Sequence, residues 1–95
     1  MKTHKIKLNR KYCDAVHNRV KTFEVRYNDR DYKVGDYIEF LPVDDDGNFF
    51  RHPVRDYAYL IVYVHEGLGM QPGYVVLGIR WTGKYSEEAH KDMFW

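Results

Sequence analysis

Within residues 21–28, with the sequence KTFEVRYN, polar and apolar side chains alternate strictly from Thr22 onward. Side chains of a β-strand point to opposite faces with a period of two, so this stretch predicts a strand with one apolar and one polar face. The apolar face is made of Phe23, Val25 and Tyr27. The polar face carries a hydroxyl, a carboxylate, a guanidinium and an amide, from Thr22, Glu24, Arg26 and Asn28. This row is either an ordinary solvated surface or the lining of a binding site.

The rest of the chain predicts a small α+β domain. Further strands are expected over residues 4–8, 37–43, 57–66 and 74–81, with a returning strand beginning at 49–52. The run 57–66 is the richest in β-forming residues and is expected at the centre of the sheet. Asn9 can cap a helix over residues 10–20, and Asp44 to Asn48 has hairpin-turn chemistry. Residues 81–95 are expected to be a tail or a short helix capped by Ser86.

The length of 95 residues predicts a single domain over residues 1–95. Cys13 is the one cysteine, so no disulfide can form within the chain. The first residues are too charged for a signal peptide, and no apolar run approaches membrane-spanning length. We therefore expect a soluble cytoplasmic protein without a membrane partner.

The net charge of +1 conceals an uneven distribution of charge. Residues 1–33 contain ten Lys or Arg and four Asp or Glu, a net charge of +6, and the remainder has a net charge of −5. Such an asymmetry can produce a local positive field, although basic stretches are often only solvated faces.

Two longer segments, KTFEVRYNDRDYKVGD and GLGMQPGYVVLGI, together with the strand–helix start, resemble the ASCH domain superfamily. The likeness extends from Lys5 to about Arg80, and is strongest to a small uncharacterised single-domain branch of bacteria and phages. It implies a small PUA-like β-barrel of about five to six mostly antiparallel strands, with one N-terminal helix and possibly a short C-terminal one. It also implies a cleft beside the helix-to-strand corner that binds RNA or a nucleotide-like ligand.

A few relatives in that superfamily deacylate a modified cytidine, using a lysine at the start of this strand, a threonine two residues before the arginine, and a later glutamate. Lys21 and Arg26 match this pattern. Glu24 occupies the threonine position and Thr22 is close by, and a carboxylate does not replace a hydroxyl nucleophile. Hydrolysis of an acylated nucleoside, with Lys21, Thr22 and Glu24 as candidates, is therefore the alternative to simple binding.

The residue types of the polar face suit a nucleotide. Arg26 offers a planar fork of donors for a phosphate, and Glu24 can accept from an amino group of a base. In a regular strand Lys21 would point away from Glu24, unless it lies at a bend after the helix. The expected ligand-binding residues are Lys21, Thr22, Glu24, Arg26, Asn28, Arg30, Lys33 and Gln71.

Among the tyrosines, Tyr27 is expected in the core, because it shares a face with Phe23 and Val25, and Tyr32 is expected to be the freest to stack on a base. No metal site or cofactor is expected, since Cys13 and His17 lack a second pair at ligand spacing. A third possibility is a protein-interaction module, suggested by the aromatic end at residues 93–95.

Overall fold

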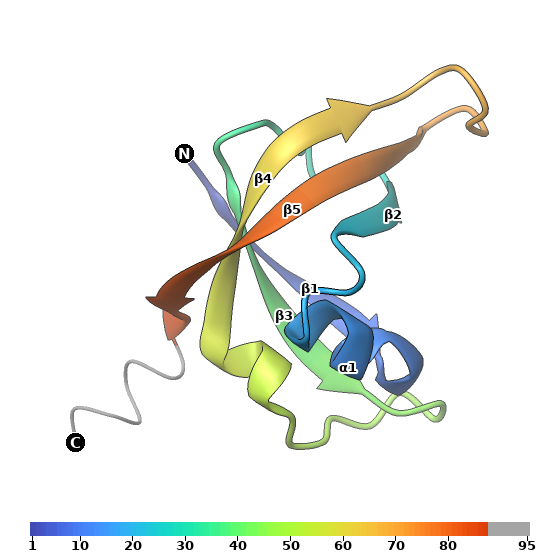
Figure 1. Cartoon of the computed structure of the whole chain (residues 1–95). Coiled ribbons are helices and arrows are strands. Elements are labelled where there is room, and N and C mark those ends of the chain that lie inside the picture. Colours follow the sequence, from blue (N-terminus) through green and yellow to red (C-terminus); the bar gives the residue numbers. More distant parts are fainter. Residues whose placement is uncertain (88–95) are drawn as a thin grey trace.

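The computed structural model describes residues 1–87 (Figure 1). In chain order the elements are β1 (Thr3–Asn9), α1 (Arg10–His17), β2 (Phe23–Tyr27), β3 (Tyr37–Val43), the 3-10 helix η1 (Pro53–Asp56), β4 (Tyr57–His65) and β5 (Tyr74–Tyr85). The expected C-terminal helix and the aromatic end at 93–95 lie outside the described residues, apart from the first positions of the helix.

The five strands form one sheet in the order β1-β3-β4-β5-β2. β1 and β3 are parallel, and the other three pairs are antiparallel. The sheet is strongly twisted and curls into a half-barrel, with α1 at one end and the β4–β5 loop at the other (Figure 1). A small α+β domain with a curled, mainly antiparallel sheet is therefore confirmed, and β4 lies at its centre as expected.

The core lies on the inner face of this sheet and follows the period-two pattern of the strands. The inward residues of β1 alternate, for example Ile6 and Leu8, and those of β5 do the same at Val75, Leu77 and Ile79. The remaining buried members of the core are Cys13, Val16, Tyr32, Ile38, Phe40, Val54, Tyr59 and Ile61.

One polar pair is also buried at the start of β1. The Nε2 atom of His4 lies 2.9 Å from a carboxylate oxygen of Asp36, and both side chains are almost fully covered. Asp36 also accepts hydrogen bonds from the backbone N–H groups of Lys2 and Lys33. This carboxylate thus joins the start of β1 to the turn before β3.

Helix α1 begins as predicted, since the side chain of Asn9 accepts a hydrogen bond from the N–H of Lys11 at 2.9 Å. It ends at His17, three residues before the predicted end at Val20. Arg19 adopts a φ of +63°, a left-handed conformation that terminates helices. The chain therefore turns sharply at Arg19 and reaches β2 through a short extended link.

Two strand boundaries differ from the prediction. Residues 49–52 form no returning strand, only an isolated bridge between Val43 and Phe49, because Pro53 opens η1 instead. β5 extends through Tyr85, so the first five residues of the expected tail continue the sheet. Tyr85 pairs with Tyr57 across an irregular register, and their rings stack at 5.3 Å.

The loop between β4 and β5 approaches the end of β2 at Gly73. This glycine has a φ of +85°, and a Cβ added there would lie 2.6 Å from a ring carbon of Tyr27. We expect Gly73→Ala to lower the free energy of unfolding in urea by about 1–2 kcal/mol, because backbone strain and the ring clash add together. Gly69→Ala is the matched control, because it has a φ of +80° and open space around it. Equal losses in the two variants would show that the contact with Tyr27 contributes nothing.

Within residues 1–87, no helix is both long and apolar enough to cross a membrane.

Candidate functional site

The polar face of β2 points inward and its apolar face points outward, which reverses the expected burial of Tyr27. Glu24 is only 3% exposed, whereas Phe23, Val25 and Tyr27 are 43%, 50% and 57% exposed. The reason is topological, since β2 is an edge strand of the curled sheet and its outer face is left exposed by residues 1–87. Its inner face points toward β1, the other edge strand of the sheet, and we call the gap between these two edge strands the seam. Within the polar row, Glu24 is therefore buried and Arg26 and Asn28 are half-buried, whereas Thr22, which precedes the strand, is exposed.

Three charged side chains meet at this seam. The ammonium group of Lys21 donates to one oxygen of the Glu24 carboxylate at 2.6 Å. Arg26 donates to the other oxygen through Nε at 3.2 Å and Nη2 at 3.1 Å. Nη2 of Arg26 also donates to the backbone carbonyl of Lys7 on β1. The carboxylate of Glu24 thus holds two cations side by side, and the group carries one net positive charge.

Lys21 reaches Glu24 because it precedes β2, which begins at Phe23, so the alternation of the strand does not apply to it. Its ammonium group also donates to the carbonyl of Phe23 at 2.7 Å. The rings of Tyr12 and Phe23 lie 5.0 and 4.6 Å from it. Lys21 is therefore held in one place by two oxygens and two aromatic rings.

A groove of about 730 Å³ lies between β1, the start of α1 and β2. A second hollow of about 460 Å³ adjoins it, and the two share Lys7, Arg26 and Tyr27. The acids lining the two hollows, among the described residues, are Glu24 and Asp29. The basic residues are Lys5, Lys7, Lys21, Arg26 and Arg30. The combined surface, which we call the seam groove, is therefore basic.

Aromatic rings line the outer wall of the seam groove. Tyr27 and Tyr74 meet edge to face with their ring centroids 5.4 Å apart, and both are exposed. Tyr12 and Phe23 add two more exposed rings. The expectation that Tyr32 is free was wrong: it is buried and its ring lies 4.7 Å from that of His4. Tyr32 lies in the irregular connection between β2 and β3, so no periodic pattern of apolar residues in the sequence indicated that it is buried.

The other predicted ligand residues are dispersed. Arg30 lines the second hollow of the seam groove. Asn28 caps the following turn by accepting from the N–H of Tyr32 at 3.1 Å. Thr22 lines a different cavity, on the far side of the link between α1 and β2.

Lys33 pairs with Asp31 at 3.3 Å in an exposed position, and Gln71 lies in the β4–β5 loop. Neither residue lines the seam groove. The structure thus brings together Lys21, Glu24, Arg26 and, more distantly, Arg30.

Several groove residues carry no local signal in the sequence. Lys7 and Asn9 come from β1 and Tyr12 from α1, and they reach β2 only because the sheet curls. To predict that these residues line the groove, one must know the order of the strands in the sheet, and no single segment of the sequence gives that order.

Metal-ligating side chains do not cluster in the described part of the chain: no group of three His, Cys, Asp or Glu side chains is suited to a metal ion. Cys13 is buried in the core, and burial, aided by the charges of Asp14 and Glu24, raises the pKa of its thiol to about 11. It therefore packs as a small apolar side chain.

The curled sheet and the seam groove define a small α+β domain with a basic, aromatic-lined candidate binding surface. Residues 3–79 match the family described as Domain of unknown function (DUF3850), and the chain belongs to that family. No curated protein matches the chain. The matched segment contains every residue that lines the seam groove.

Proposed function

We propose that the protein binds single-stranded RNA, or a nucleotide of the same chemistry, in the seam groove, and that its half-barrel is of the PUA-like ASCH type. The observation that carries the proposal is the buried Glu24 carboxylate, which holds Lys21 and Arg26 at the wall of a groove large enough for a nucleotide. A buried carboxylate that fixes two cations organises them in advance for an anionic ligand.

Glu24 has a different role in this proposal from the one expected from the sequence. Both of its oxygens already accept hydrogen bonds, so it positions the cations rather than reading a base edge. The hydrogen bonds of Arg26 to Glu24 and Lys7 use its Nε and Nη2 atoms, which leaves Nη1 for a phosphate oxygen. Lys7 and Arg30 extend the positive surface along the same groove.

The cations bind the phosphate in this proposal, and the exposed aromatic rings of the seam groove bind the bases. Each base stacked on an aromatic side chain contributes about 1–3 kcal/mol in single-strand binders. Tyr27 and Tyr74 line the same groove as Arg26, with the rings on the outward face of β2 and the guanidinium on its inward face. A strand that passes over the edge of β2 can therefore stack a base on the rings and place a phosphate at the guanidinium. This arrangement favours a flexible single strand over a duplex, whose bases are already stacked.

The test is a fluorescence-anisotropy titration of the full chain with a labelled single-stranded RNA octamer at several salt concentrations. Tyr27→Ala is expected to weaken binding by about 5–100-fold, the equivalent of one lost stacking contact. The ring of Tyr27 is 57% exposed, so its removal should leave the fold intact. Affinity is also expected to fall with rising salt, because phosphate contacts release counterions.

Tyr63→Ala is the matched control, since Tyr63 is 63% exposed on β4 and does not line the seam groove. It should bind RNA like the unaltered protein. Equal losses in the Tyr27 and Tyr63 variants would contradict the location of the site. Absence of binding at low salt for both RNA and free nucleotides would contradict the function.

A further inference from the structure

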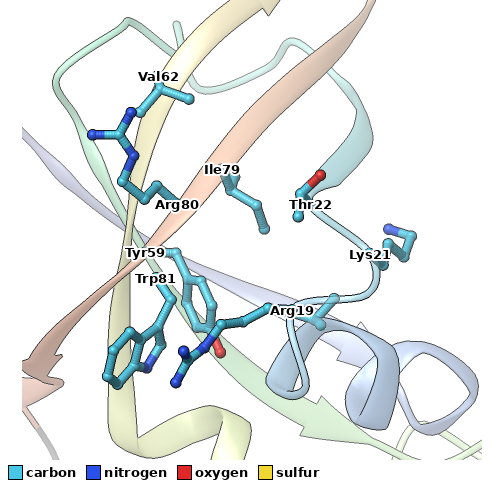
Figure 2. Close-up of a pocket in the computed structure, with 9 residues that line it drawn as sticks. Arg19, Lys21, Thr22, Tyr59, Val62, Ile79, Arg80 and Trp81 are labelled. Atoms are coloured by element: carbon cyan, nitrogen blue, oxygen red, sulfur yellow. The ribbon is translucent and has the colours of Figure 1, made fainter.

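A separate cavity of about 290 Å³ lies on the other side of the link between α1 and β2 (Figure 2). Its walls come from the end of α1, the link itself, β4 and β5, whereas the seam groove lies against β1. Its lining residues are Val16, Arg19, Lys21, Thr22, Tyr59, Val62, Ile79, Arg80 and Trp81. The volume is close to the lower end of small-molecule sites, at roughly 300 Å³.

The hydroxyl of Tyr59 is the anomalous group in this cavity. Tyr59 is 2% exposed, and its hydroxyl oxygen is buried without a hydrogen-bond partner among the described residues. Burying a hydroxyl without a partner costs about 1–3 kcal/mol, so a phenol at this position is unfavourable unless something binds to it. Phenylalanine would fill the same space without this cost.

A guanidinium lies at the same end of the cavity as this hydroxyl. Figure 2 shows the side chains of Arg19 and Tyr59 directed toward one another, with Trp81 beside them. The guanidinium of Arg19 lies 3.7 Å from the centroid of the Trp81 ring, which holds it in place. Arg19 reaches this position through its left-handed backbone, with a φ of +63°.

The charges around the cavity select the kind of ligand. Among the described residues its lining contains no acid and three basic residues. The ammonium group of Lys21 is already paired with Glu24, and the guanidinium of Arg80 points away from Tyr59 (Figure 2), so Arg19 is the cation that faces the hydroxyl. The last carbonyls of α1, which would repel an anion, already accept hydrogen bonds from the N–H groups of residues 18–21. The remaining walls are apolar and include Val16, Ile79 and the ring of Trp81. A ligand that fits is therefore compact, anionic at one end and apolar at the other.

We propose that this cavity is a second binding site, for a compact organic anion whose oxyanion accepts from Tyr59 and Arg19 and whose apolar body packs against Ile79 and Trp81. Burial raises the pKa of Tyr59 to about 12, although the charge of Arg19 opposes this, so the phenol is a neutral donor at physiological pH. The site does not depend on RNA binding in the seam groove.

The experiment titrates the isotopically labelled full chain with three probes: benzoate, phenyl phosphate and benzyl alcohol. The indole N–H of Trp81 is followed by NMR. The two anions distinguish a carboxylate ligand from a phosphate monoester, and benzyl alcohol has the same ring without the charge. At least one anion is expected to bind about tenfold or more tightly than the alcohol and to shift the Trp81 signal to saturation.

Two variants sharpen the test. Tyr59→Phe is expected to reduce anion affinity about tenfold or more while leaving the melting temperature equal or higher, because it removes an unpartnered buried hydroxyl. Arg19→Gly should also reduce the affinity, and glycine accepts the left-handed backbone. Arg51→Ala is the control, since Arg51 is exposed and outside the cavity. Unchanged anion affinity in Tyr59→Phe, a lower melting temperature in that variant, or equal binding of benzyl alcohol would each overturn the proposal.

Discussion

Replacing Arg26 with alanine is expected to lower the free energy of unfolding by about 2–3 kcal/mol. The carboxylate of Glu24 is buried and would lose two of its three charged hydrogen bonds. The carbonyl of Lys7 would lose its donor from β2 at the same time. The measurement is urea denaturation followed by circular dichroism, with the full chain at neutral pH.

Arg51→Ala is again the control, because an exposed arginine outside such a network usually contributes within about 0.5 kcal/mol. A second variant isolates the cause. Adding Glu24→Leu to Arg26→Ala removes the buried charge that the first substitution leaves unpaired, and should restore a large part of the loss. A double variant as unstable as the single one would show that the carboxylate is not the source of the instability.

Asp36→Ala is expected to cost about 2–4 kcal/mol of unfolding free energy, measured in the same way. The substitution leaves the buried ring of His4 without its partner and orphans the N–H groups of Lys2 and Lys33. Asp44→Ala serves as a comparison, because its carboxylate also accepts two backbone N–H groups but in an exposed loop. Similar losses in the two variants would contradict the importance of burial at Asp36.

The same carboxylate gives the stability a defined dependence on pH. Burial opposes ionisation of Asp36, but the hydrogen bonds from His4, Lys2 and Lys33 outweigh it and lower the pKa of the carboxyl below its usual 3.8. The unfolded chain therefore binds the proton more tightly, so this contribution is present above about pH 4 and is lost as the pH falls below it. Asp36→Asn should show a shallower loss of stability in that acid range than the unaltered chain. Parallel acid profiles would contradict the assignment.

The strands were the most predictable part of the fold. The runs at 37–43 and 57–66 match β3 and β4 almost residue for residue, because both are rich in β-branched and aromatic residues and are bounded by turn-forming residues or loops. The cap at Asn9 was equally local, since it depends on one side chain and a neighbouring N–H. The end of α1 was not predicted, because no glycine marks it and Arg19 takes the left-handed conformation instead.

The sequence predicted the residues of the candidate groove only in part, since Lys21, Glu24, Arg26 and Arg30 line it and the other four predicted residues do not. It did not predict the orientation of β2. Alternation separates Glu24 and Arg26 from Phe23 and Val25, yet it does not say which face turns inward. That choice depends on the curl of the sheet, which brings the edge strand β2 opposite β1. The resemblance to the ASCH superfamily remains a prediction, and the family of the chain is one of unknown function.

The contact between Arg26 and the carbonyl of Lys7 has a mechanical consequence. β1 and β2 are the two margins of the sheet, and they do not pair with one another through a backbone ladder within residues 1–87. The guanidinium of Arg26 connects them through its hydrogen bond to the carbonyl of Lys7. If a ligand's oxygens took Nη2 from the carbonyl of Lys7 as well as binding Nη1, the contact between β1 and β2 would be lost and the groove between them would widen. By thermodynamic linkage, a conformation in which β1 and β2 are already separated would bind that ligand more tightly than the conformation in which Arg26 contacts Lys7.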